Sequence, residues 1–311
     1  MGSDLVYDAL VLGGGPAGLA AAVQLARFNR SVLVFDGGGG RSSYHQVNHN
    51  YLGFPGGISI RDFRRASREQ AARLPVAFID EEAAAVSRQG SCFVARTAAG
   101  IQANGRTVVF ATGVRDRFPD FPGWESYVGR SIFWCIVCDG YSTRGRRIVV
   151  VANDDDGGVT ALQFLQFTSH VTVLSNAAQC GVGAKVRGEL QARGIRLVED
   201  EIAGVLGHDG ILGAVQLKRG GTLEADYLFS LQGSNPASDL AAGLGCERSA
   251  LGYIVTDMEQ RTNVPGVFAA GDVTRDLAHQ VATAVHEGIT AATTANYSLY
   301  AAWQRHERYR E

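Results

Sequence analysis

The sequence lacks three features, which are typical of membrane proteins, of proteins that bind nucleic acid or membrane surfaces through bulk charge, and of secreted proteins. It has no apolar stretch of the roughly 18 to 20 residues that a membrane-spanning helix needs. Its 29 basic and 31 acidic residues nearly cancel to a net charge of −2, so no bulk attraction to nucleic acid or membrane surfaces is implied. No basic segment with a cleavage site surrounds the first apolar run, at residues 9–12. We therefore expect a cytoplasmic globular protein.

Cysteine is scarce and irregularly spaced. The five cysteines comprise one close pair, Cys135 and Cys138, and three isolated residues, Cys92, Cys180 and Cys246. An odd number without regular spacing is a poor framework for secreted disulfides, and a structural zinc site would need a second Cys or His pair. In a cytoplasmic chain the lone pair is expected to be redox-active. Half of a metal site and two inert buried thiols are the alternatives.

Glycine, in contrast, is abundant, with 39 residues. An apolar strand pattern at residues 6–10 leads into Gly13-x-Gly15-x-x-Gly18, a helical pattern at 19–26 and a second strand pattern at 31–35. This order predicts a βαβ unit. The first glycine allows the tight turn, the second lets a pyrophosphate approach the backbone, and the third permits close helix–strand packing.

An acid ends the second strand of this unit: Asp36 follows Gly13 by 23 residues. A carboxylate here can accept hydrogen bonds from a ribose, and the helix N-terminus stabilises phosphate charge. A chance glycine turn with a surface Asp is the alternative. We predict a dinucleotide site with contacts from Gly13, Gly15, Pro16, Ala17, Asp36, Gly37 and Arg41.

Two short motifs follow later strand patterns. Ala111-Thr112-Gly113 comes after residues 107–110, and a turn of small residues can pass beside a flavin dinucleotide. The strand pattern at 266–270 ends in Gly271-Asp272, whose carboxylate can bind a ribityl hydroxyl. An ordinary turn and a plain buried strand are the alternatives. The expected cofactor contacts from these motifs are Thr112, Gly113, Gly271 and Asp272.

The motif with redox chemistry is Cys135-x-x-Cys138-Asp139. Two cysteines two residues apart at a helix start can close a reducible disulfide. A helix N-terminus lowers the pKa of a thiol, which favours exchange. Asp139 can exchange protons with a thiol or a flavin. These three residues are the predicted catalytic groups.

A second βαβ pattern has strands at residues 147–151 and 171–174 around a helix at 159–167, and a long helix is expected from Gln280 to about Arg305. Together with the first unit it forms a weak internal repeat. We therefore predict an α/β fold with two doubly wound, Rossmann-like domains, of which one is discontinuous in sequence.

In order and spacing, these motifs resemble low-molecular-weight bacterial thioredoxin reductases over nearly the whole chain. The matching positions are residues 13–18, 111–113, 135–140, Gly233-x-Asn235-Pro236, 266–273 and Gln280. The resemblance implies a homodimer with an FAD-binding domain at 1–117 and 246–311. It places the CxxC motif in a central domain, 118–245, with a degenerate NAD(P)-binding fold.

The resemblance also implies roles for individual residues. Cys138 would face the flavin, Cys135 would attack the substrate disulfide, and Asp139 would act as the acid–base group. The flavin pyrimidine edge would lie along His279, Gln280 and Val281. The implied partner is a thioredoxin-like protein, or else a small disulfide or dithiol.

The chain departs from this family at the second nucleotide motif. The glycine fingerprint is replaced by Ala152-Asn153-Asp154-Asp155-Asp156-Gly157, and the basic cluster for the NADPH 2′-phosphate by Ser175-Asn176-Ala177-Ala178. In this the chain is similar to the deeply-rooted, pyridine-nucleotide-independent branch. We therefore expect no useful reduction by NADPH, with a ferredoxin or another protein as a candidate donor.

Smaller departures affect the flavin site. Gly53 stands where the family has an Asn, with Asn48 or Asn50 as substitutes, and His279 replaces an Arg. An aromatic tail is expected either to pack at three-residue steps or to cover a flavin, in this chain or in a dimer partner. The tail comprises Tyr297, Tyr300, Trp303 and Tyr309.

Three functions fit these features. The first is an FAD-dependent reductase of a thioredoxin-like protein. The second is an oxidase that passes electrons from a small dithiol to oxygen, and the third is a flavin-binding redox sensor without turnover. The intact Cys-x-x-Cys-Asp motif disfavours the third.

Overall fold

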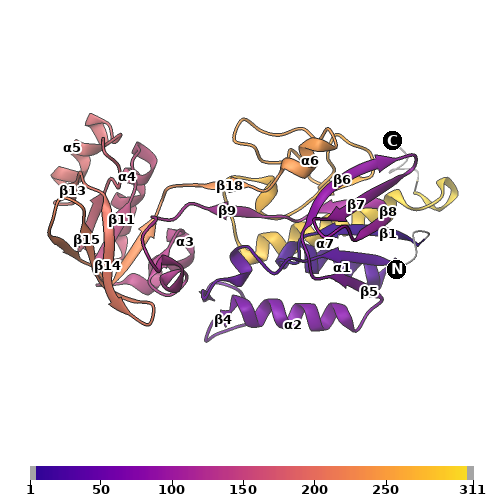
Figure 1. Cartoon of the computed structure of the whole chain (residues 1–311), viewed down its shortest axis with the longest axis horizontal. Helices are drawn as coiled ribbons and strands as arrows, with labels where there is room; N and C mark the ends of the chain where they lie inside the picture. The colour runs from indigo at the N-terminus through magenta and orange to yellow at the C-terminus, as the bar shows by residue number, and fades with distance from the viewer. Residues whose placement is uncertain (1–4, 307–311) are drawn as a thin grey trace. The chain divides into compact units, whose positions relative to one another are not determined.

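The computed structural model describes residues 5–306, which fall into two compact units (Figure 1). Unit 1 is built from the chain up to Ser43, residues Ile60–Arg115 and the chain from Asn235 onward, and unit 2 from Tyr44–Ser59 and Asp116–Ser234. The predicted α/β class with a discontinuous unit is confirmed. The assignment of a cofactor to each domain stays a prediction.

Unit 1 is organised around a mostly parallel sheet with the strand order β5-β2-β1-β8-β7-β6, in which β19 also pairs with β8. The parallel strands are β1 (Val6–Leu12), β2 (Val32–Phe35), β5 (Val76–Ile79), β8 (Gln102–Phe110) and β19 (Val267–Ala269). An antiparallel edge is formed by β6 (Ala83–Gln89) and β7 (Cys92–Thr97). The helices are α1 (Pro16–Arg27), α2 (Ile60–Ala72), α6 (Asp239–Gly243) and α7 (Val281–Ser298).

The apolar run of β1 is buried on both faces of this sheet. Ala9 and Val11 pack with residues of α1 and α7, whereas Leu10 and Leu12 belong to a separate cluster on the other face. Successive side chains of a strand point to opposite faces, so a continuous apolar run suits a covered parallel strand.

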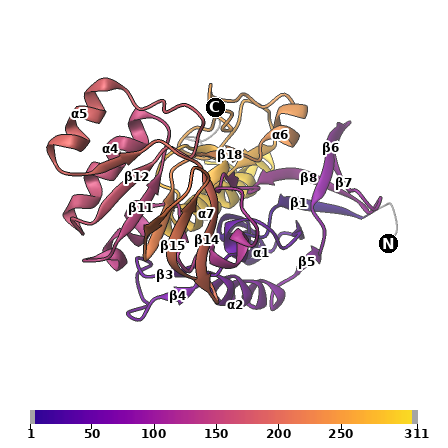
Figure 2. The same cartoon turned by 60° about the vertical axis from the view of Figure 1, so that its left-hand side comes forward.

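Unit 2 contains a parallel sheet and an antiparallel sheet. The parallel sheet has the order β10-β17-β11-β12-β13, from Ile132–Phe133, Tyr227–Ser230, Ile148–Val151, Val171–Leu174 and Arg196–Val198. Helices α4 (Asp155–Gln163) and α5 (Ala184–Ala192) cover one face, packing on Ile148 and Val150. The other face packs on the antiparallel sheet of β14 (Ile202–His208), β15 (Ile211–Leu217) and β16 (Thr222–Glu224) (Figure 2).

The remaining elements are short. Strands β3 (Val47–Asn48) and β4 (Ile58–Ser59) pair in unit 2, and the unit boundaries at 115/116 and 234/235 fall inside the paired strands β9 (Val114–Asp116) and β18 (Ser234–Pro236). The disulfide helix is α3 (Ile136–Asp139). Single 3₁₀ turns occur at Arg41–Ser43, Trp124–Tyr127, Gly140–Thr143, Phe164–Gln166, Asp272–Thr274 and Ala302–Gln304. No helix within residues 5–306 is long and apolar enough to cross a membrane.

Two predicted helix boundaries are wrong. Helix α7 was expected to reach about Arg305 but ends at Ser298. The Arg305 side chain donates hydrogen bonds to the carbonyl oxygens of Ser298 (2.9 Å) and Tyr300 (3.1 Å), which satisfies carbonyls beyond the reach of the helix. Helix α4 begins at Asp155, earlier than the predicted 159, so its first turn is acidic.

Candidate functional site

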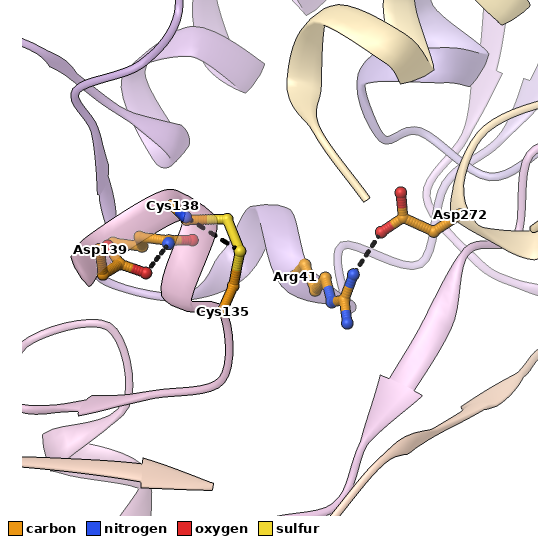
Figure 3. The surroundings of a disulfide bond; sticks show 6 residues. Arg41, Cys135, Cys138, Asp139 and Asp272 are labelled. Atoms are coloured by element: carbon orange, nitrogen blue, oxygen red, sulfur yellow. Dashed lines mark hydrogen bonds and ion pairs between the residues drawn. A yellow bond between two sulfur atoms is a disulfide. The ribbon is translucent and has the colours of Figure 1, made fainter. Parts of the chain in front are cut away.

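Cys135 and Cys138 form a disulfide at the start of α3, as the sequence predicted (Figure 3). Cys135 is the N-cap residue, and its sulfur accepts a hydrogen bond of 3.1 Å from the backbone N–H of Cys138. Both cysteines are half-buried, while Val137 between them is 75% exposed. The bonded pair therefore lies near the surface of unit 2, where exchange with another thiol is sterically feasible.

An aromatic cluster fixes the chain on both sides of this disulfide. The Tyr44 ring lies 5.3 Å from that of Trp134, the residue before Cys135, and 5.9 Å from that of Phe118. Phe118 stacks on Trp124 at 5.1 Å. Each aromatic pair adds about 1 kcal/mol beyond the apolar area it buries. The cluster holds the segment that begins at Tyr44 against the disulfide-bearing part of unit 2.

This segment contains the hydrogen-bond partner of Asp139. The side chains of Gln46 and Asp139 are 6% and 5% exposed, and Gln46 Nε2 donates a 2.9 Å hydrogen bond to Asp139 Oδ2. Gly129, at φ +75°, packs so closely on the Gln46 backbone that a Cβ there would overlap its nitrogen. No motif singled out Gln46, because it is separated from Asp139 by 93 residues and acquires its role only through folding.

Burial raises the pKa of Asp139 to about 7, and the hydrogen bond from Gln46 opposes that rise. A carboxyl group that titrates near neutrality is suited to both accepting and returning a proton. The chemistry predicted for Asp139 therefore has a physical basis in its surroundings.

The glycine turn of unit 1 leads into α1, whose N-terminus has no side-chain cap and no acid in its first turn. Gly13 is at φ +114°, and Cβ atoms on Gly13 or Gly18 would overlap carbonyl oxygens of Ala111 and Gly13 respectively. Gly15 is different: the nearest atom to a Cβ there is Ser42 Oγ, at 4.0 Å. The chain itself requires Gly13 and Gly18, whereas Gly15 leaves open space at the uncapped helix start, which fits a pyrophosphate group.

Asp36 directly follows β2, lies beside this turn and is 4% exposed. Arg64 and Arg68, both on α2, contact its two carboxylate oxygens at 2.5 and 2.8 Å. Arg64 Nε also donates to the Gly14 carbonyl oxygen, at 3.2 Å. The arginines thus fix the acid against the turn. No sequence motif marks these two arginines, because they lie on a helix that the sequence patterns did not predict.

The other predicted cofactor residues surround the same end of the unit 1 sheet. Arg41 Nη1 contacts Asp272 Oδ2 at 2.7 Å (Figure 3). Gly271, at φ +82°, packs on Ala17, and its N–H donates to the buried Glu287 carboxylate at 2.7 Å. The predicted residues follow β1, β2, β8 and β19, so they gather at the carboxyl ends of parallel strands, where ligands of such sheets bind.

The remaining predicted contacts have simple local settings. Thr112 Oγ1 donates to the Ala237 carbonyl oxygen at 2.7 Å, and Gly113 is at φ +68°. Gly37 packs so closely on Glu82 that a Cβ there would overlap that side chain. His279 Nε2 lies 2.7 Å from the Arg275 carbonyl oxygen. Helix α1 begins with Pro16, and α7 begins at Val281 with Gln280 as its N-cap.

The N-terminus of α4, in unit 2, is closed by the chain's own carboxylates. Asp154 is the N-cap, and its Oδ1 accepts the Gly157 N–H at 2.8 Å. Asp155 Oδ1 accepts the Gly183 N–H at 2.6 Å, and Asn153 Oδ1 accepts the Gly181 N–H at 2.7 Å. These bonds attach the loop at residues 181–183 to the turn where a second nucleotide would bind in an intact Rossmann domain.

The aromatic tail packs locally where it is described. The Tyr297 and Tyr300 rings meet edge to face at 5.6 Å, and the Arg30 guanidinium lies 5.2 Å from the Tyr300 ring centre. Trp303 is 80% exposed, and Tyr309 lies outside the described residues. Of the proposed Asn substitutes near Gly53, Asn48 has a buried Nδ2 with no hydrogen-bond partner within residues 5–306.

We predict that Asp139→Asn gains stability relative to wild type as pH rises. The carboxyl of Asp139 has a pKa of about 7 in the fold and an ordinary pKa near 4 when unfolded, so the stability it contributes below about pH 4 is lost as pH rises to 7. Between about pH 5 and about pH 8.5, the difference in unfolding free energy should move by about 3 kcal/mol in favour of the variant. Denaturant unfolding of both proteins measures it; a pH-independent difference contradicts the prediction.

Comparisons with known proteins agree with these features. The chain matches the pyridine nucleotide-disulphide oxidoreductase family over residues 7–288. It is 32% identical over 315 residues to thioredoxin reductase tcpT of Claviceps purpurea, covering 97% of each chain. The solved thioredoxin reductase of Streptococcus pyogenes superposes with a TM-score of 0.87 at 28% identity, over 96% of this chain and 99% of that one. The atypical thioredoxin reductase TRi of Desulfovibrio vulgaris is 32% identical, with a TM-score of 0.53 over 94% and 98% of the chains.

The match to the family covers the glycine turn, the disulfide helix and the start of α7, and the similarity to thioredoxin reductases extends over nearly the whole chain. Thioredoxin reductases of this family are flavoproteins that carry FAD, and the open turn at Gly15 provides space for such a dinucleotide. The chain therefore belongs to the pyridine nucleotide-disulphide oxidoreductase family and is a thioredoxin-reductase-like, FAD-dependent thiol–disulfide oxidoreductase.

Proposed function

We propose that this enzyme passes electrons between FAD and the Cys135–Cys138 disulfide, and on to a thioredoxin-like partner, without taking them from NADPH. The observation that carries the proposal is the closed N-terminus of α4. The atypical thioredoxin reductase among its relatives supports a departure from the usual members of the family.

Electrostatics and hydrogen bonding both oppose a nicotinamide dinucleotide at α4. The backbone N–H of Gly157 already has the Asp154 carboxylate as its acceptor, and Asp155 and Asp156 add two charges to the same turn. A carboxylate about 4 Å from a phosphate costs roughly 4 kcal/mol at an effective dielectric near 20. A helix dipole contributes only about 0.3–1 kcal/mol in the other direction.

The residues of unit 1 would hold FAD. Gly15 and the uncapped start of α1 would receive the pyrophosphate, and Asp36 the adenosine ribose. Asp272, held by Arg41, would lie along the ribityl chain. Bound there, FAD supplies two-electron redox chemistry. The residues at 279–281 would line its pyrimidine edge, as in the family that the chain resembles.

The two cysteines would have different roles. Cys138 would face the flavin and Cys135 would exchange with the substrate disulfide, while Asp139 supplies and accepts the proton. Opening the disulfide takes up two electrons and produces two thiolates, one of which Asp139 can protonate. The pKa of Asp139, about 7, suits that transfer near neutral pH.

One observation favours a second candidate, a dithiol oxidase. With α4 closed to nucleotides, the half-buried disulfide beside the exposed Val137 offers an entry for electrons from the substrate side. A small dithiol would then become a disulfide, its two electrons would pass through Cys135–Cys138 and FAD, and oxygen would leave as hydrogen peroxide. In the reductase direction, a ferredoxin or another protein donor would reduce FAD.

We further propose that the enzyme is a cytoplasmic homodimer. Each chain would have an FAD-binding domain at residues 1–117 and 246–311 and a central domain at 118–245. Sedimentation of the purified holoenzyme tests the dimer.

NADPH should not bleach the flavin of the anaerobic holoenzyme within seconds, even at millimolar concentration, because the Gly157 N–H already bonds to the Asp154 carboxylate and the acids of this turn repel a pyrophosphate. Dithiothreitol, which enters through the disulfide, should bleach it and serves as the positive control. Stopped-flow absorbance measures both. Rapid bleaching by NADPH would refute the donor proposal while leaving the oxidoreductase assignment intact.

Turnover assays separate the two candidate functions. The reductase should reduce oxidised thioredoxin when an artificial one-electron reductant is supplied. The oxidase should release hydrogen peroxide from a small dithiol in air. Turnover in neither assay would count against both.

Gly15→Val should fold but lose FAD, because Gly15 has φ −81° and open space that only a ligand would occupy. Gly18→Val is the contrasting variant: its Cβ overlaps the Gly13 carbonyl oxygen, so it should also lose its fold. Circular dichroism reports folding, and the FAD absorbance of the purified protein reports retention. A yellow Gly15→Val protein would place the pyrophosphate elsewhere.

Cys135→Ser should retain a thiolate–flavin charge-transfer band, and Cys138→Ser should lose it, because the proposed arrangement puts Cys138 next to the ring. The absorbance of each variant with oxidised flavin, at wavelengths longer than the main flavin bands, measures this. The reverse pattern would exchange the two roles.

A further inference from the structure

The strongest unassigned contact near the disulfide is the one between Gln46 and Asp139. Both side chains are almost fully buried, and the bond of 2.9 Å joins an amide donor to a single carboxylate oxygen, Oδ2. Burying two polar side chains costs desolvation free energy, and the hydrogen bond between them offsets that cost only when donor and acceptor are well aligned.

We propose that Gln46 is a positioning residue for the acid–base group: its side-chain amide holds the Asp139 carboxylate in one orientation, supports its charged form, and leaves Oδ1 as the oxygen that carries the exchanged proton. The inference rests on the acid–base role proposed for Asp139.

The surrounding structure makes this orientation rigid. Gln46 cannot retreat from Asp139, because Gly129 packs against its backbone and the Tyr44 ring packs against Trp134 and Phe118. On the other side, Gly140 follows Asp139 and packs on the Phe167 ring, where a Cβ would come within 2.7 Å of Cε2. Donor and acceptor are therefore held by two separate sets of packing contacts.

The amide acts in the proton step as follows. When a substrate thiolate attacks one sulfur of the disulfide, a mixed disulfide forms between substrate and enzyme, the Cys135–Cys138 bond breaks, and the other sulfur leaves as a thiolate. That thiolate takes the proton from Asp139, which becomes a carboxylate. The N–H of Gln46 stabilises this new charge in a site where burial penalises it.

Few groups other than Gln46 act on the pKa of Asp139. Burial and the Gln46 bond are the two influences on the pKa of Asp139, and no charged side chain within residues 5–306 adds to them. The titratable groups nearby are the cysteines of α3 when reduced, Tyr141 in the following turn, and His45, whose ring Nδ1 lies 3.2 Å from Arg130. A pH effect of Gln46 substitutions can therefore be assigned through Asp139→Asn.

The test uses two variants of the holoenzyme at position 46, one that removes the hydrogen-bond donor and one that replaces it with a second carboxyl group. Gln46→Met keeps the size of the side chain but removes the donor, so the pKa of Asp139 should rise by about one unit. Gln46→Glu places a second carboxyl there and should raise it further, because two carboxyls at hydrogen-bond distance cannot both ionise freely. Gln260→Met is the control, since Gln260 is equally buried at 6% exposure.

Two readouts follow the change. Carbon-13 NMR of aspartate-labelled holoenzyme gives the pKa of Asp139, with Asp139→Asn assigning the signal. The pH profile of flavin reduction by dithiothreitol should shift upward in the same order, wild type, Gln46→Met, Gln46→Glu, and remain unchanged in Gln260→Met.

The outcomes separate this inference from the function on which it rests. An unchanged pKa of Asp139 in Gln46→Met overturns the positioning role. If Asp139→Asn leaves the limb of the pH profile near 7 intact, the proposed acid–base role fails and the inference falls with it. A shift of both readouts in the stated order supports the two together.

Discussion

The N-terminus of a helix presents backbone N–H groups that can bond to a ligand phosphate or to the chain's own side chains, and they cannot do both at once. This constraint divides the two nucleotide turns of the enzyme. Helix α1 begins without a cap and with open space at Gly15, whereas α4 begins with the Asp154 carboxylate on its Gly157 N–H. Similar βαβ units thus differ in whether the chain itself occupies the start of the helix.

The disulfide centre depends on a segment that no local pattern marks. Residues from Tyr44 onward cross from the chain of unit 1 into unit 2, and the aromatic contacts with Phe118 and Trp134 hold them there. Their position buries Asp139 and supplies its amide partner. Redox chemistry at Cys135–Cys138 is therefore prepared by packing contacts between residues that are about 90 positions apart in sequence.

Sequence patterns predicted the elements whose functional residues are close together in the sequence. The turn at Gly13–Gly18, the strand before Asp36 and the helix start at Cys135 all follow from spacing and residue type. The hydrogen-bond and ion-pair partners of these groups could not be predicted from spacing. Arg64 and Arg68 contact Asp36 from a helix that no motif indicated. Gln46 contacts Asp139 from 93 residues away in the sequence. The end of α7 was misplaced because the capping contacts of Arg305 form only in the folded chain.

In the proposed function, the self-capped turn at α4 has a consequence for metabolism. An enzyme that cannot accept hydride from the nicotinamide pool does not follow the ratio of its reduced to oxidised forms. Its oxidation state instead equilibrates with the carriers that reach FAD and with the thiols that reach Cys135–Cys138. Three acidic residues in one turn, Asp154, Asp155 and Asp156, would thereby isolate a branch of thiol exchange from the main supply of biosynthetic reducing power.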